Sequence, residues 1–132
     1  MIFNYNIFVA YYNLLGYNIL RKDFWSMNII ESDKYKKAYS KILKNNINDQ
    51  RNLNDIKLLI KESFNLHELI INPLSIIYHI EQKKGNLKEY YSARINNKIR
   101  LIMKPIGKYP YKTIEITDIE FIDIDNKHYE RW

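Results

Sequence analysis

The stretch YYSARINNKIRLIMK, residues 90–104, constrains the fold most, because it predicts a β-hairpin in one register. A three-residue turn at 96–98 places Arg94 opposite Arg100, and asparagine tolerates the positive φ found in such turns. A two-residue turn would mix polar and apolar side chains, since a slip of one residue moves every side chain to the other face. The predicted apolar face holds Tyr91, Ala93, Ile95, Ile99, Leu101 and Met103, and the polar face holds Tyr90, Ser92, Arg94, Arg100 and Lys104, with Ile102 as the exception.

The facing arginines need a compensating negative charge. Like charges directly opposite each other on a sheet cost about 0.2–1 kcal/mol. Either an acidic side chain of the same protein or an external anion offsets that repulsion. The acidic side chains considered for the first alternative are Glu115, Asp118 and Glu120.

The rest of the chain predicts helices before the sheet. Residues 28–31 are expected to form a short strand, and Ser32 or Asp33 is expected to cap a helix with an apolar stripe at helical spacing. A second helix is expected at about 53–69, after a polar loop at 45–52. The apolar run 74–80 fits either a strand or a buried turn, and a phase slip in 112–125 indicates a bulge or a second strand near 117–121. The prediction is an α+β fold: a small, mainly antiparallel sheet with an N-terminal helical hairpin packed on one face.

Composition narrows the classes of function. A chain of 132 residues with 46% hydrophobic residues suits one globular domain, and three scattered histidines without cysteine predict no metal site and no cofactor. The net charge of +6 is localised: residues 81–112 hold seven lysines and two arginines against two glutamates, a balance of +7. Residues 113–132 hold six acids against two basic residues, a balance of −4. A basic patch favours a nucleic acid partner, and a solvated lysine-rich surface is the alternative.

Residues 1–26 are treated separately from the domain predicted at 27–132. The apolar segment 7–20 is too short to span a membrane, and no basic residue precedes it as in a signal peptide. One interpretation is that translation starts at Met27. The other is that residues 1–26 add an amphipathic helix that covers an edge of the core.

The segment KKGNLKEYYSARINNKIRLIMKP resembles the core signature of RelE/HigB-like toxins of bacterial type II toxin–antitoxin systems. The ending IEITDIEFIDIDNKHYE is similar to that of the plasmid-maintenance killer proteins of the RelE/ParE superfamily. The resemblance covers about residues 27–132 and implies a RelE-like fold. It also implies a cytoplasmic, ribosome-dependent mRNA endonuclease that works without metal, held inactive by an antitoxin, expected to be a helix-turn-helix DNA-binding protein.

Such an enzyme lets the 2′-OH of the RNA attack the adjacent phosphate, so its residues position the substrate, stabilise charge and move protons. Arg94 and Arg100 match the family arginines, and Lys98 is a further electrostatic candidate. His128 is expected to exchange protons, and Tyr129 to stack on a base or donate a proton. The residues expected to contact RNA or the ribosome are Lys83, Lys84, Lys88, Tyr90 and Lys104.

Two other functions fit the same resemblance. A ParE-like protein would poison DNA gyrase without cutting RNA. A non-catalytic member would only bind an antitoxin.

Overall fold

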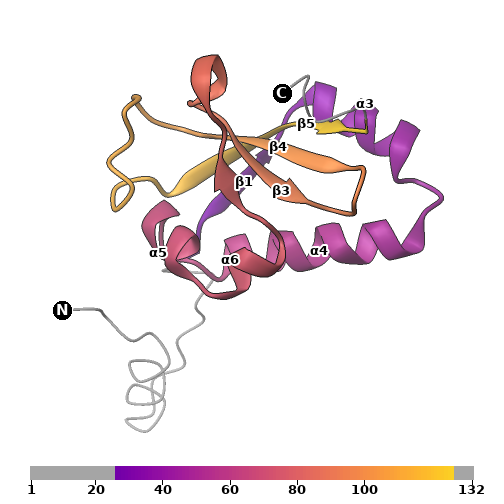
Figure 1. Ribbon diagram of the computed structural model, residues 1–132, viewed down its shortest axis with the longest axis horizontal. Coiled ribbons are helices and arrows are strands. Elements are labelled where there is room, and N and C mark those ends of the chain that lie inside the picture. The colour runs from indigo at the N-terminus through magenta and orange to yellow at the C-terminus, as the bar shows by residue number, and fades with distance from the viewer. Residues whose placement is uncertain (1–25, 127–132) are drawn as a thin grey trace, which may run out of the picture.

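The computed structural model describes residues 26–126, which form a five-stranded sheet with four α-helices in the order β1-α3-α4-α5-α6-β2-β3-β4-β5 (Figure 1). The strands are β1 (Asn28–Glu31), β2 (Glu81–Gln82), β3 (Tyr91–Arg94), β4 (Arg100–Pro105) and β5 (Asp118–Asp125). Their order in the sheet is β1-β5-β4-β3-β2. Every neighbouring pair is antiparallel except β1 and β5, which are parallel. The predicted α+β class with a mainly antiparallel sheet is confirmed.

The two long helices, α3 (Asp33–Ile42) and α4 (Ile47–Lys61), begin at polar caps. Ser32 Oγ accepts the backbone N–H of Tyr35 at 3.0 Å, as the sequence predicts for a capping residue. Asn46 Oδ1 accepts the N–H of Asp49 in the same way, so α4 starts six residues earlier than expected. Asparagine caps helices as well as breaking them, and the predicted polar loop at 45–52 is therefore mostly helix. The predicted end at residue 69 is also wrong, because Asn65 caps a separate helix, α5 (Leu66–Ile71).

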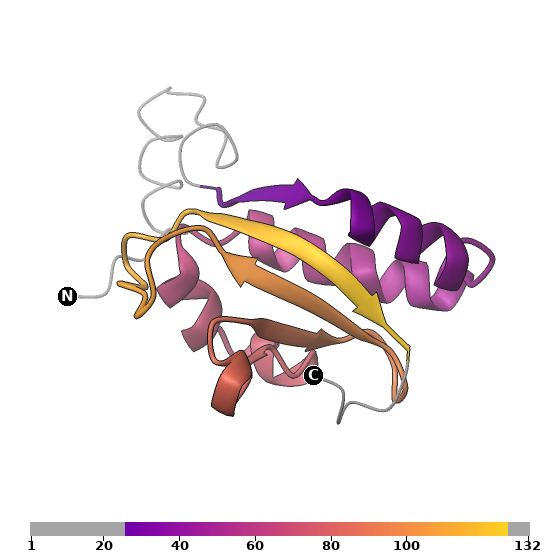
Figure 2. The ribbon, with the colours of Figure 1, turned by 90° about the horizontal axis from the view of Figure 1, so that it is seen from above.

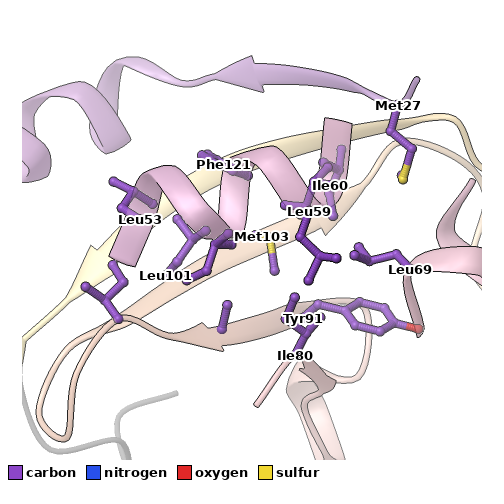
Figure 3. Packing of buried hydrophobic residues seen from close by; sticks show 14 of the residues in the cluster. Met27, Leu53, Leu59, Ile60, Leu69, Ile80, Tyr91, Leu101, Met103 and Phe121 are labelled. Atoms are coloured by element: carbon purple, nitrogen blue, oxygen red, sulfur yellow. The ribbon is translucent and has the colours of Figure 1, made fainter. Parts of the chain in front are cut away.

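The core lies between these helices and one face of the sheet. Figure 3 shows Leu53, Leu59 and Ile60 of α4 beside side chains of β4 and β5. Tyr35 of α3 packs edge-on against Phe121, with ring centroids 5.3 Å apart. Figure 2 shows α4 passing behind the strands and α3 lying next to α4 at the side of β5. The helical hairpin therefore packs on one face of the sheet, as predicted.

The hairpin has the predicted register. Arg94 pairs with Arg100 and Ala93 with Leu101. The expected positive φ is not found at residues 96–98, because His79 is the non-glycine residue with positive φ within residues 26–126. The turn depends instead on a hydrogen-bonding side chain. Asn96 Oδ1 accepts the N–H groups of Lys98 at 2.7 Å and Ile99 at 2.8 Å, an arrangement that asparagine favours in turns.

The segment after β4 contains the predicted bulge at a different place. The strand begins at Asp118, while residues 113–115 form a turn. Ile102 pairs with Asp123 and Met103 with Phe121, so the extra residue is Ile122, just beyond the predicted interval of 117–121. The bulge explains why Phe121 and Ile124 both face the core although three positions separate them.

The remaining described elements are short. The ambiguous run 74–80 contains the helix α6 (Leu74–Ile77), followed by β2 and the 3₁₀ helix η1 (Gly85–Leu87). Length alone could not separate these possibilities, because the run is apolar without a clear period. Among the described residues, no helix has the length and apolar composition needed to cross a membrane.

Candidate nucleic-acid interface

The face of the sheet opposite the helices, here called the outer face, carries the candidate site. Strand pairing places Arg94, Arg100 and Asp125 side by side across β3, β4 and β5. We call these three residues the arginine row. The outer-face side chains of the next two rows are Ser92, Ile102 and Asp123, then Tyr90, Lys104 and Glu120. Ile102, the exception in the sequence pattern, is fully buried but lies outside the main core cluster.

The two arginines are half-buried and differently held. Arg100 Nη1 donates to the carbonyl oxygens of Asn96 at 2.7 Å and Ile99 at 3.3 Å, so its guanidinium braces the turn of its own hairpin. Arg94 Nε is buried and has no hydrogen-bond partner. A buried donor without an acceptor costs about 1–3 kcal/mol, and an anion at this position would supply one. The arrangement thus favours a negatively charged ligand.

Asn96 links the arginine row to the helices. Its Nδ2 donates to Asp49 Oδ1 at 2.9 Å, and Asn52 Nδ2 of α4 donates to the Ile95 carbonyl at 3.0 Å. Asp49 is only 5% exposed and its other carboxylate oxygen has no partner. The N-terminal part of α4 therefore fixes the position of the hairpin turn at 96–98. Through the Asn96 carbonyl it also fixes the position of the Arg100 side chain. Sequence reasoning missed this link because 47 residues separate the two side chains.

Lys83 lies at the edge of this cluster. Its backbone N–H donates to the Tyr90 carbonyl at 2.9 Å, which places its side chain on the outer face. Burial lowers the pKa of Lys83, and nearby Arg100 lowers it further, against the opposing effects of Asp125 and Glu81. A lysine with a lowered pKa gives up its proton more readily than an ordinary lysine does.

The other predicted binding residues are spread more widely. Lys104 Nζ lies 5.7 Å from the centroid of the Tyr90 ring, so these two form a unit on the outer face. Lys88 instead lies over Tyr109 at 5.4 Å, Lys84 is exposed before η1, and Lys98 is exposed at the turn. His128 and Tyr129 lie outside the described residues. The structure thus brings together five of the ten predicted site residues: Lys83, Tyr90, Arg94, Arg100 and Lys104.

The acid beside the arginines differs from the three that the sequence suggested. Asp125 pairs with Arg100, whereas Glu120 pairs with Lys104. Asp118 accepts a hydrogen bond from Asn28 at 2.7 Å, and Glu115 is exposed before β5. Counting the β4–β5 register backwards would have identified Asp125 only if the bulge at Ile122 had been known.

The similarity of this chain to known proteins lies in its structure. No family model matches the sequence, and no curated protein matches it. A YoeB/ParE toxin from Agrobacterium tumefaciens is 16% identical, with 77% of this chain and 100% of that chain covered and a TM-score of 0.53. The YoeB dimer from Staphylococcus aureus is 24% identical, with 78% and 98% covered and a TM-score of 0.52. The DinJ–YafQ toxin–antitoxin complex from E. coli gives 20% identity, 76% and 92% coverage, and a TM-score of 0.53.

The chain has the fold of these toxins. The predicted RelE-like fold is thereby confirmed, and it rests on the arrangement of helices and sheet, since the identities are low. These toxin structures do not test the assignment to the HigB branch, which stays a prediction. They also leave the roles of individual residues on this toxin fold as predictions.

Proposed function

We propose that this protein is the toxin of a type II toxin–antitoxin pair and cleaves mRNA on the ribosome without a metal ion. The observation that carries the proposal is the pairing of Arg94 with Arg100 on the outer face of a sheet with the toxin fold. Two guanidinium groups on paired residues of neighbouring strands present several N–H donors to one phosphate group. Lys83, with its lowered pKa, lies beside them.

The proposed reaction uses the RNA's own 2′-OH as the nucleophile. The bond from the 2′-oxygen to phosphorus forms as the bond from phosphorus to the 5′-oxygen of the next nucleotide breaks, which leaves a 2′,3′-cyclic phosphate and a 5′-OH. The 2′-OH gives its proton to a base, and the departing 5′-oxygen takes one from an acid. Arg94 and Arg100 stabilise the additional negative charge on the phosphate oxygens, which is the largest single contribution expected from this site. The buried Arg94 Nε, which has no partner, supports this role. His128 and Tyr129 are proposed to transfer protons or to stack on a base, and Lys83 is a further proton-transfer group.

Binding is proposed to involve a wider basic surface. Tyr90 and Lys104 lie on the outer face two rows from the arginine row, and Lys84, Lys88 and Lys98 are exposed. Exposed lysines contribute to RNA affinity mainly through phosphate contacts that weaken with salt. The proposed protein partner is an antitoxin, as in the YoeB–YefM complex and the DinJ–YafQ complex.

The test is a cell-free translation reaction in which cleavage of a reporter transcript is mapped by primer extension, with and without ribosomes. Arg94→Ala and Arg100→Ala are each expected to slow cleavage by about 100-fold or more. Arg51→Ala is the matched control, because Arg51 is exposed on α4, on the helical side of the sheet. Circular dichroism of each variant verifies that the fold is intact.

Each alternative function has its own outcome in this assay. Intact transcripts together with accumulated gyrase–DNA breaks would replace the proposal with gyrase poisoning. Intact transcripts without gyrase damage would leave antitoxin binding as the function. Cleavage that persists after both arginines are replaced would show that the arginine row does not contribute to catalysis.

A further inference from the structure

Helices α5 and α6 expose an apolar surface that the proposed function does not use. Five side chains within residues 70–77 have exposed fractions between 39% and 77%: Ile70, Ile71, Leu74, Ile76 and Ile77. We call them the α5–α6 patch. The two helices contact each other, so the five residues lie on adjoining parts of the surface. A concentration of exposed apolar residues of this kind marks a surface that another segment covers.

The described chain begins beside this patch. The backbone N–H of Met27 donates to the Ser63 carbonyl at 3.0 Å, and α5 starts three residues after Ser63, at Leu66. Figure 1 shows β1 close to α5 at this end of the molecule. A helix of six residues is roughly 9 Å long, and six extended residues span up to roughly 20 Å. The six residues 21–26 therefore provide enough chain length for preceding residues to reach the patch.

The sequence before this linker has the matching chemistry. Residues 7–20, IFVAYYNLLGYNIL, contain no charged residue, and only Asn13, Gly16 and Asn18 interrupt the apolar composition. The stretch 66–80 likewise holds one charged residue, Glu68, and no lysine or arginine. Two apolar surfaces associate by removing area from water, and the five side chains of the α5–α6 patch are all uncharged.

We propose that residues 7–20 of the same chain bind the α5–α6 patch and act as an internal cover. Connection through a short linker makes the local concentration of the segment on the order of millimolar, which a separate partner seldom reaches. The cover shields the patch from self-association. The proposed contact does not depend on RNA cleavage.

Engineered cysteines test the contact directly, because the sequence contains no cysteine of its own. In the full chain, the pair Leu15→Cys and Ile76→Cys is expected to form a disulfide within one chain at least 10-fold faster than the control pair Leu15→Cys and Lys44→Cys. Lys44 is exposed between α3 and α4, at the opposite end of the roughly 22 Å α4 helix. Equal rates for the two pairs would overturn the proposal. A disulfide that forms only between chains would assign the patch to a second copy.

Hydrogen exchange provides a second measurement that needs no disulfide. In the full chain carrying Leu14→Asp and Leu15→Asp, amides of α5 and α6 are expected to exchange about 10-fold faster than in the parent protein. Amides of α4 serve as the internal control and are expected to keep their rates. Unchanged exchange in α5 and α6 would show that residues 7–20 do not cover them. Protection that appears only after an antitoxin is added would assign the patch to that partner.

Discussion

Substituting Asn96 tests whether a buried link from α4 maintains the turn that carries Arg100. Asn96→Ala removes three hydrogen bonds at once: those from the N–H groups of Lys98 and Ile99, at 2.7 and 2.8 Å, and the one to Asp49 Oδ1, at 2.9 Å. It also leaves the carboxylate of Asp49, 5% exposed, without its amide donor. The neighbouring Asn97→Ala is the matched control, because Asn97 is exposed at the same turn.

The magnitude follows from these contacts. The two backbone bonds together contribute about 1–2 kcal/mol, since water reaches the exposed turn. Removing the donor from a buried carboxylate adds about 2 kcal/mol. We expect Asn96→Ala to lower the free energy of unfolding by about 3–4 kcal/mol, and Asn97→Ala by less than about 0.5 kcal/mol. Urea denaturation followed by tyrosine and tryptophan fluorescence measures both changes.

A side-chain swap separates the link from other effects of the substitution. Asn96→Asp alone places two carboxylates in contact and is expected to destabilise the fold strongly. Combined with Asp49→Asn, it restores an amide donor to a carboxylate acceptor with the two positions exchanged. The double-mutant cycle should give a coupling free energy of about 2 kcal/mol. A coupling below about 0.5 kcal/mol would refute the idea that this contact holds the turn.

Three further predictions concern the caps and the titrating groups. Ser32→Ala removes two hydrogen bonds of 3.0 Å each, the cap of α3 and the bond from Ser32 Oγ to the Ile122 carbonyl. Urea denaturation should show that the free energy of unfolding falls by about 1 kcal/mol. The control Ser40→Ala, at an exposed position on the same helix, should leave it almost unchanged. Because burial lowers the pKa of Lys83 from 10.5, the unfolded chain binds that proton more tightly, and the free energy of unfolding gains a positive slope as the pH rises toward 10.5. Lys83→Met should flatten that slope and Lys84→Met should not; identical slopes in the two variants would contradict the assignment. Burial, and secondarily Glu89, raises the pKa of Tyr111 to about 12, so its stabilising contribution is complete below pH 10 and is lost as the pH rises from 10 to 12. Tyr111→Phe should remove this loss, as measured by unfolding at fixed pH values across that interval.

Local patterns predicted the hairpin well and the helices less well. The register at 90–104 follows from side-chain alternation, which has a period of two and leaves no second solution. The sequence predicted one helix at about 53–69 where the structure has α4 and α5, because Asn46 and Asn65 favour both loops and helix caps. Composition alone does not distinguish these roles, whereas the packing of Leu53, Ile56 and Ile60 under the sheet favours the helix.

The candidate site shows the same division. The sequence predicted that Arg94 and Arg100 share a face, and the strand pairing confirms it. It did not predict Asp125 as the third member of the arginine row, because a bulge in β5 changes which acid faces Arg100. Nor did it predict that Asp49 of α4 binds the side chain of Asn96.

The sequence by itself determined which residues of the hairpin face the core and which face outward, because neighbours in one strand settle that question. Only the tertiary structure decided which distant side chains reach the arginines, since the register between β4 and β5 and the position of α4 depend on packing of the whole domain. Side-chain alternation along a strand depends on consecutive residues, whereas contacts between distant segments form only when the whole core is packed.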